Sequence, residues 1–216
     1  MDWNEYFKMM IDWKKLPAYR AEPRIDSLIG FYLQDILSSI LGDSISGIIP
    51  EFPLRLGTVN PVINDKNYAD RSYKVDFLAI GSKGVNYLVE FKTDGKSLRP
   101  GQDKYLIQGE KVGTEKIIQG VLRISGVSSY KVKYKHLLDK MQKYRVLDEN
   151  KKYSGLNPTS EKIYVIPFNK TNSSDTIDFK DIVEWFEQRT GKDSFELALM
   201  KALQIWYDEE AKNYER

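Results

Sequence analysis

The sequence predicts an α/β protein in which a central mixed β-sheet of about four to five strands is flanked by helices. Two observations predict this class. Several segments carry apolar residues at helical spacing, and short runs rich in β-branched and aromatic residues interleave with them along the chain. The chain has 216 residues, of which 41% are hydrophobic and 30% charged. That length and composition are typical of a single domain with a sizeable core, so we expect one domain over residues 1–216.

The first third of the chain predicts a helix followed by a strand. Apolar residues recur at helical spacing from Arg24 to Leu41, and Gly42 is placed to end this helix. Ile48 to Leu56 then alternates as a strand. Its two prolines, Pro50 and Pro53, indicate an edge strand or a bulge, because proline cannot donate to a neighbouring strand.

The middle of the chain predicts a β-hairpin, and the rest predicts mainly helices. Tyr73 to Ile80 and Val85 to Thr93 are two β-rich runs joined by the turn sequence Gly81-Ser82-Lys83-Gly84. The remaining expected elements are a helix over 98–124 broken at Gly109 or Gly113, a basic segment over 130–145 that is helical in its second half, a strand over 162–168, and helices over 179–189 and 194–207.

Composition excludes several kinds of site. The chain has no cysteine and one histidine, His136. Disulfides, thiolate zinc sites and multi-histidine metal sites are therefore excluded, and catalysis would depend on carboxylates, lysine, hydroxyls or a metal held by oxygen. The first 15 residues carry several charges and no continuous apolar run reaches membrane-spanning length. From this we expect a cytoplasmic protein without a membrane partner.

The predicted hairpin carries three charged residues in apolar surroundings: Asp76 in its first strand, and Glu90 and Lys92 in its second. Burying an isolated carboxylate is costly, so these groups should have partners. Alternation places Glu90 and Lys92 on one face. A three-residue loop, Ser82 to Gly84, would place Asp76 opposite Glu90, whereas a four-residue loop would send the two acids to opposite faces. We favour the three-residue loop.

Two acids side by side repel each other unless a cation lies between them or a proton is taken up. Oxygen ligands with open positions for water and phosphate suit Mg²⁺, so Asp76 and Glu90 are the candidate metal ligands. Lys92 could orient a water molecule or neutralise developing phosphate charge. The alternative interpretation is a carboxylate–lysine salt bridge at the sheet edge.

In this pattern the sequence resembles the PD-(D/E)xK nuclease superfamily. Asp76 is followed, after a hairpin, by Glu90-Phe91-Lys92, with a helix and strand before and a helix after. Val75 stands where the motif often has proline. The resemblance implies a restriction-endonuclease-like fold over a core of about residues 22–168, with an N-terminal helix (1–16) and C-terminal helices (178–212) as additions. It also implies Mg²⁺-dependent hydrolysis of DNA with Asp76 and Glu90 as ligands and Lys92 assisting the attacking water, and Mn²⁺ is expected to substitute.

The same resemblance suggests further catalytic residues. Many members add an acid from the first helix, for which Glu22 and Asp26 are candidates, and we favour Glu22. Glu22 could instead cap that helix. Some members carry Gln-x-x-x-Tyr on the helix after the lysine strand. Here Gln102 begins Gln102-Asp103-Lys104-Tyr105, which is one residue short, so Gln102 is either a site residue or an exposed polar residue at a helix start.

The charge distribution fits either a solvated, lysine-rich helix surface, which charge alone favours, or a surface that meets a polyanionic partner. Residues 83–152 carry 16 basic and 8 acidic side chains although the net charge of the whole chain is +2. The segment Tyr130 to His136 interleaves tyrosines with lysines, as nucleic-acid surfaces often do, or it is simply a solvated helix face. We expect DNA as the substrate, with RNA as the alternative and a homodimer left open. The rival function is a catalytically inactive nuclease-like module that binds nucleic acid or a protein.

Overall fold

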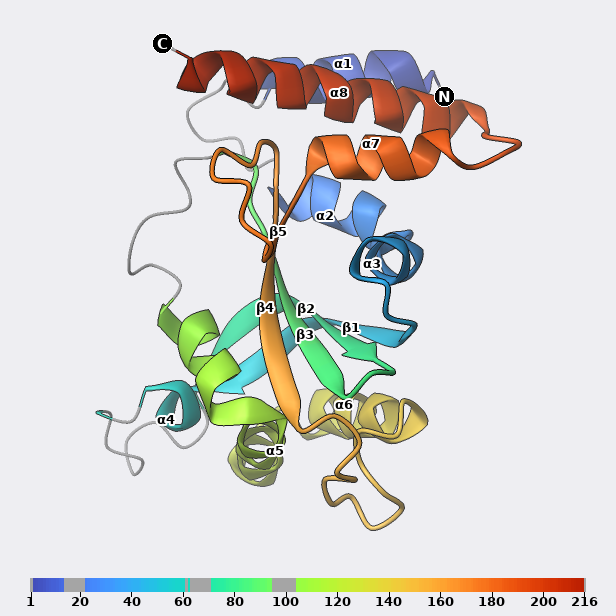
Figure 1. The fold of residues 1–216 in the computed structure, drawn as a ribbon. Helices are drawn as coiled ribbons and strands as arrows, with labels where there is room; N and C mark the ends of the chain where they lie inside the picture. Colours follow the sequence, from blue (N-terminus) through green and yellow to red (C-terminus); the bar gives the residue numbers. More distant parts are fainter. Residues whose placement is uncertain (1, 14–21, 61, 63–70, 95–103, 216) are drawn as a thin grey trace. The chain divides into compact units, whose positions relative to one another are not determined.

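The fold is described from a computed structural model that covers residues 2–13, 22–60, 62, 71–94 and 104–215, without the side chains of residues 22 and 23. It is an α/β fold with an open, mixed, five-stranded sheet of order β1-β2-β3-β4-β5, flanked by helices (Figure 1). The predicted coarse class is therefore confirmed. The strands are β1 (Ile45–Arg55), β2 (Ser72–Gly81), β3 (Val85–Phe91), β4 (Thr159–Ile166) and β5 (Thr176–Asp178). The helices are α1 (Trp3–Trp13), α2 (Glu22–Gly30), α3 (Leu33–Leu41), α4 (Leu56–Val59), α5 (Lys104–Val127), α6 (Lys131–Lys143), α7 (Phe179–Glu187) and α8 (Ser194–Tyr214).

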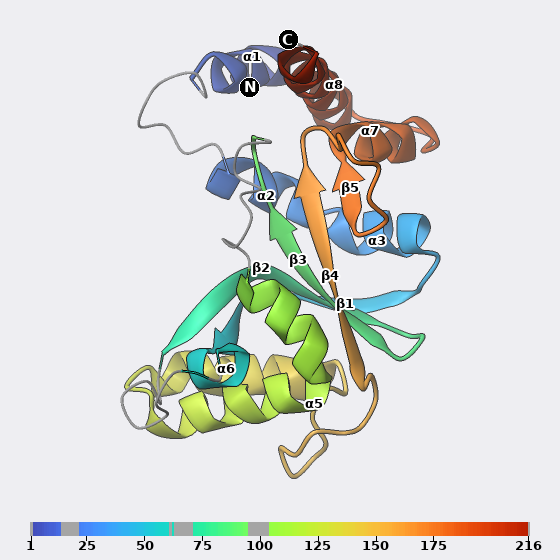
Figure 2. The ribbon, with the colours of Figure 1, turned by 60° about the vertical axis from the view of Figure 1, so that its left-hand side comes forward.

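The chain divides into two compact units. The first comprises residues 1–40, 91–99 and 164–216, and the second comprises residues 41–90 and 100–163. In the first unit α1 and α8 pack side by side, and α7 packs against α8 (Figures 1 and 2). The core of this unit includes a cluster of aromatic rings: Tyr32, which immediately precedes α3, contacts Trp185 and Phe186 of α7. Burial of such rings supplies most of the free energy that holds helices of this kind together.

The helix predicted over Arg24 to Leu41 is wrong in one respect, because the structure has two helices there. The chain turns after Gly30, where the backbone N–H of Tyr32 donates to the carbonyl of Ile29 at 2.9 Å. Glycine is a poor helix former, and the side chain of Phe31, 82% exposed, gains nothing from continuing the helix. The predicted end is confirmed: Gly42 follows α3 with a left-handed φ of 59°.

In the second unit, β1 is the edge strand that its prolines predicted. It pairs antiparallel with β2, and the register shifts between Ile45 and Gly47. Glu51, next to Pro50, has a left-handed φ of 51°, so the strand is irregular there as well. The strand ends at Arg55 because Leu56 begins the short helix α4, so Leu56 is a helical residue and not the predicted end of the strand.

Two long helices of the second unit, α5 and α6, lie side by side in both ribbon views (Figures 1 and 2). Of the two glycines at which a break was predicted in α5, Gly113 is the one that breaks it, with a left-handed φ of 77°. Residues 98–103 of the predicted helix lie outside the described residues. The basic segment is helical over nearly its whole length as α6, and not only in its second half. The strand predicted at 162–168 is β4, and the two predicted C-terminal helices are α7 and α8.

Within the described part of the chain, no helix combines the length and the apolar character that crossing a membrane would require.

Candidate functional site

The register of the β2–β3 hairpin is the feature that defines the site. Phe77 pairs with Val89, and Leu78 with Leu88. The paired register ends at Phe77 and Val89. Continued by one residue toward the open end of the hairpin, it would put Asp76 opposite Glu90 and on the same face. The three-residue loop is thus confirmed, with Gly84 in the left-handed conformation at φ 88°.

Helix α5 covers the face of β3 that carries Glu90. The phenol O–H of Tyr105 donates to Glu90 Oε1 at 3.0 Å, and Asn86 Nδ2 lies 3.4 Å from Thr114 Oγ1. Between these two contacts the helix approaches so closely that a Cβ at Gly109 would lie 2.9 Å from Leu88 Cδ1. Glycine at this position therefore allows α5 to come near enough for Tyr105 to reach the carboxylate.

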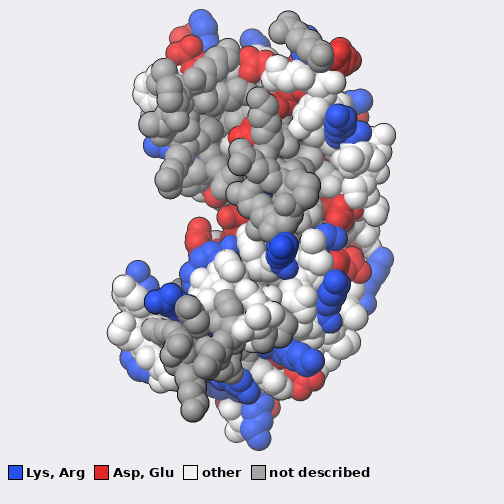
Figure 3. Space-filling model, turned by 90° about the vertical axis from the view of Figure 1, so that its left-hand side faces the viewer, with Lys and Arg blue, Asp and Glu red and all other residues white. Residues whose placement is uncertain are grey.

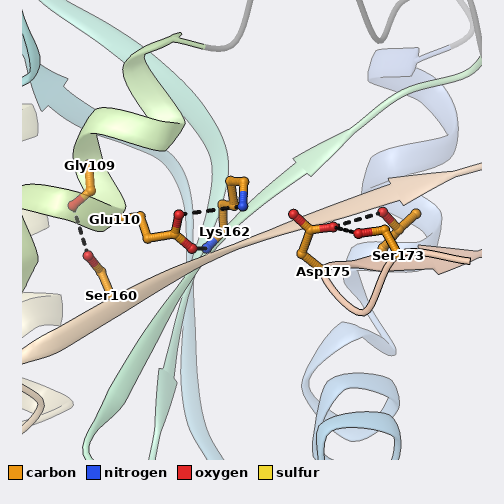
Figure 4. Close-up of polar contacts among 7 residues, drawn as sticks. Gly109, Glu110, Ser160, Lys162, Ser173 and Asp175 are labelled. Atoms are coloured by element: carbon orange, nitrogen blue, oxygen red, sulfur yellow. Dashed lines mark hydrogen bonds and ion pairs between the residues drawn. The ribbon is translucent and has the colours of Figure 1, made fainter. Parts of the chain in front are cut away.

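Two polar contacts fasten α5 to the neighbouring strand β4 (Figure 4). The hydroxyl of Ser160 donates to the backbone carbonyl of Gly109 at 2.9 Å, in a buried position. At the next residue of α5, Glu110 Oε2 forms an ion pair with Lys162 Nζ at 3.4 Å. Because both anchors lie within five residues of Tyr105, they fix the helix segment that presents its hydroxyl to Glu90.

The acidic pair occupies a site of low water access. The side chain of Glu90 is buried, with 6% of the residue exposed, and Asp76 is half-buried. A cation placed between two carboxylates with reduced hydration would stabilise both charges.

The donor set fits a hard dication. Mg²⁺ is commonly held by one or two carboxylates, with water and substrate phosphates completing its octahedron. Asp76 and Glu90 supply two carboxylates from neighbouring strands. In the portion of the chain that the structure describes, no group of three or more His, Asp or Glu side chains is close enough to hold a metal.

Lys92 belongs to the first unit and continues the direction of β3. It is buried, with 9% of the residue exposed, and its backbone N–H donates to the carbonyl of Val165 at 2.8 Å. A lysine is rarely buried to this extent without a function or a partner. Lys92 and Glu90 fall in different units. Alternation along the strand would place them on the same side.

The remaining predicted residues are placed as follows. Gln102 and the side chain of Glu22 lie outside the described residues. Asp26 is a half-buried residue of α2 in the first unit. His136 is exposed on α6, as expected for a surface residue.

Tyr105 is a residue of the site to which the sequence pattern assigned no role. The signal was present, since Tyr105 closes the motif that begins at Gln102 on the helix after the lysine strand. Its ring stacks on Tyr73 with centroids 4.8 Å apart. Both rings line a hollow of about 300 Å³ that also contains Lys104, Gln108 and Lys111. A cationic, hydrogen-bonding hollow therefore lies beside the tyrosine whose hydroxyl touches Glu90.

No family model, curated protein or solved structure matches this chain. The geometry of the hairpin and its surroundings is therefore the basis for a proposed function.

Proposed function

We propose that this protein is a Mg²⁺-dependent nuclease that hydrolyses phosphodiester bonds in DNA, in a defence, restriction, repair or mobile-element setting. The observation that supports the proposal is the hairpin register, which, continued one residue past Phe77 and Val89, would bring Asp76 opposite Glu90, the carboxylate that Tyr105 of α5 contacts. Asp76 and Glu90 would hold the ion. When bound, the ion would act as a Lewis acid on the phosphate and lower the pKa of water.

Two other side chains would complete the site. The Tyr105 hydroxyl, 3.0 Å from Glu90 Oε1, would orient that carboxylate toward the ion and limit its rotation. Lys92, two residues beyond Glu90, would orient the attacking water or stabilise negative charge that develops on the phosphate. In this scheme Tyr105 is a positioning residue, whereas Asp76, Glu90 and Lys92 are catalytic.

The surface of the second unit supports a polyanionic substrate. Lys and Arg side chains are frequent over this unit, in the lower half of the view in Figure 3. On α5 alone, Lys104, Lys111, Lys116 and Arg123 are exposed. Lysines and arginines of this kind neutralise phosphates and release counterions, so binding of DNA should weaken steeply as salt increases.

The test is cleavage of plasmid and linear DNA in Mg²⁺ or Mn²⁺ by the full chain and by three variants. Glu90→Gln and Asp76→Asn remove one ligand charge each and should lower the rate by about 100- to 1000-fold, the usual loss for one preorganised charged group. Glu149→Gln is the matched control: it removes an exposed carboxylate of the same unit away from the hairpin, and should retain the parent rate. Equal rates for the parent and Glu90→Gln would refute the proposal.

One observation favours the rival function of a catalytically inactive module that binds nucleic acid or a protein. Glu90 is closely enclosed, and a tyrosine hydroxyl already occupies one of its oxygens. If this rival is correct, the parent binds DNA but releases no products in either metal, and Lys92→Ala behaves as the parent does. DNA and RNA substrates of the same sequence, assayed in parallel, decide between the two nucleic acids.

A further inference from the structure

A second site on the same unit is separate from the acidic pair. Helix α6 and the irregular part of β1 enclose a groove of about 600 Å³, which we call the α6 groove. Residues of β1, residues of β2, Tyr130 and residues of α6 as far as Lys140 line the groove. All of them lie within residues 41–90 and 100–163. Neither Asp76 nor Glu90 is among its lining residues. A hollow of this volume is within the range that binds small ligands or single segments of a polymer.

The groove is basic. Lys74 of β2 and Lys133 and Lys140 of α6 line it, with Glu51 as the acidic residue of the lining. Its described lining thus brings three ammonium groups together with one carboxylate, and an anion placed among them would be attracted. The lining therefore carries an excess of positive charge for an anionic ligand.

The groove is also aromatic. Tyr130 and Tyr134 lie one helical turn apart and both line it. Tyr130 is 66% exposed, and Lys133 Nζ lies 5.6 Å from the centroid of its ring. A tyrosine this exposed, with a cation held near its ring, offers a platform on which a planar base can stack beside a charge that meets the neighbouring phosphate.

The wall opposite α6 is preformed. Pro50 and Pro53 fix the backbone on either side of Glu51, which has a left-handed φ of 51°. Non-glycine residues in this conformation are uncommon and concentrate at ligand sites and turns. Ile49 and Leu137 add an apolar floor. A site with an apolar floor, aromatic platforms and cations around them is the arrangement that recognises a nucleotide segment.

The geometry points to a single-stranded segment of nucleic acid as the ligand of the α6 groove, with its phosphates on Lys74, Lys133 and Lys140 and a base on Tyr130. Bases in a duplex are stacked on each other and present only their edges, so they cannot reach a tyrosine inside a hollow. Unpaired bases can be splayed out and stacked on aromatic side chains. An acidic peptide would satisfy the lysines but would make no use of the exposed ring of Tyr130. This inference rests on the proposed function for its choice of ligand and adds to it a strand-holding site.

The experiment measures fluorescence anisotropy of a labelled 12-nucleotide oligo(dT) and of a blunt duplex of equal length, with EDTA present so that nothing is cleaved. The variants are Lys133→Gln/Lys140→Gln and Tyr130→Ala. The matched control is Lys151→Gln/Lys152→Gln, which removes the same charge from exposed residues outside the groove. Thermal unfolding of each variant verifies that it remains folded.

We expect the groove lysine variant to bind oligo(dT) at least 10-fold more weakly than the parent, and its salt slope to fall by about 1.4, two phosphates' worth. Tyr130→Ala should lose about 5-fold or more. The control should lose less than 3-fold, and duplex binding should change less than oligo(dT) binding in every groove variant. Equal losses for groove and control variants, or equal losses for duplex and oligo(dT), would overturn the inference.

Two further arms test the class of ligand and the independence of the two sites. A poly-glutamate peptide that displaces oligo(dT) as well as unlabelled oligo(dT) does, with no effect of Tyr130→Ala, would assign the groove to an acidic peptide and refute the inference. The cleavage assay of the parent decides the nuclease site separately. A parent that releases no products in Mg²⁺ or Mn²⁺ but binds oligo(dT) through the groove lysines would refute the proposed nuclease function and still support the inference.

Discussion

The two ends of the β2–β3 hairpin each have a buried carboxylate beside them, but the groups around the two carboxylates differ. At the turn, Asp43 is 1% exposed and accepts hydrogen bonds from the backbone N–H of Ser82 at 2.9 Å, the Ser82 hydroxyl at 2.8 Å, the N–H of Lys83 at 3.1 Å and the Tyr87 hydroxyl at 3.0 Å. At the open end, Glu90 is 6% exposed, and the same register, continued one residue past its last pair, would place a second carboxylate, Asp76, opposite it.

The two acids differ in the hydrogen-bond donors and charges that surround them. Burial opposes ionisation of Asp43, but the hydrogen bonds from Ser82, Tyr87 and Lys83 outweigh it and lower the pKa of this carboxyl. Burial and the hydrogen bond to Asp43 together raise the pKa of Tyr87 to about 12. Asp43 therefore acts as a structural anchor whose charge is stabilised by protein donors. In the proposed site, Asp76 and Glu90 would place like charges together, an arrangement that a bound cation would stabilise.

The turn end is reinforced by a second buried polar group. Asn157 Nδ2 donates to the carbonyl of Gly81 at 2.7 Å and to Asn86 Oδ1 at 2.9 Å. Buried groups with their hydrogen bonds satisfied make a segment rigid and fix its register. The hairpin is thus held firmly at the end far from the acids, and that rigidity transmits the register to Asp76 and Glu90.

Removing the anchor should have the largest effect on stability. Asp43→Ala leaves several buried donors without their acceptor, and we expect the free energy of unfolding to fall by about 3 kcal/mol. For a chain of this size the midpoint of thermal unfolding should fall by about 6–12 °C. Urea titration measures the first quantity and a thermal scan the second. A loss below about 0.5 kcal/mol would show that Asp43 is not the anchor.

Tyr105→Phe sharpens the comparison at the open end. It removes the hydroxyl that donates to Glu90 and leaves the ring stacked on Tyr73. Loss of a hydrogen bond to a metal-binding carboxylate typically costs 10- to 100-fold in metal affinity or activity. We expect cleavage to slow by about that factor, with a higher Mn²⁺ concentration needed for half-maximal rate. An unchanged Mn²⁺ dependence would mean that Tyr105 only packs there.

Glu90→Gln should be nearly neutral for stability in the absence of divalent cations. Glutamine keeps an oxygen for the Tyr105 hydroxyl and removes the repulsion with Asp76, so the free energy of unfolding should change by less than about 1 kcal/mol. Urea titration in EDTA measures this. A loss of about 3 kcal/mol or more would identify Glu90 as a member of a structural salt-bridge cluster, the outcome that the rival interpretation of these charges requires.

The smallest expected effect is a difference in the acid dependence of stability. Because the folded-state pKa of Asp43 is lowered, its charge stabilises the protein fully above the unfolded-state value of about 4, and this contribution is lost as pH falls through the folded-state pKa. The stability difference between the parent and Asp43→Asn should therefore be constant from pH 5 to 7 and shrink below pH 4. A difference that grows on acidification would contradict the assignment.

Features encoded within a few residues could be predicted from the sequence. The loop Ser82 to Gly84 determines the hairpin register, because Gly84 readily takes the left-handed conformation that a three-residue loop needs. The prolines of β1 marked it as an edge strand for an equally local reason, the missing N–H. Gly113 breaks α5 at one of the two glycines where a break was predicted.

Features that depend on distant partners could not be predicted. Asp43 sits in a turn sequence of no distinctive type, and its donors lie 39 to 44 residues away. Tyr105 reaches Glu90 only because Gly109 lets α5 approach β3, a packing detail that no periodicity reveals. The break after Gly30 was missed because apolar spacing continues through Tyr32 on both sides of the turn.

Thermal unfolding in EDTA and in excess Mg²⁺ or Mn²⁺ tests most directly whether the acids at the open end form a cation site. At about ten times the dissociation constant, binding to the folded state alone adds about 1.4 kcal/mol, which should raise the parent's midpoint by about 3–6 °C. Glu149→Gln, which removes an exposed carboxylate of the same unit, should show the same rise, and Glu90→Gln and Asp76→Asn should show none. A parent without any rise, or a Glu90→Gln variant that rises as much as the parent, would contradict a cation site between these two carboxylates.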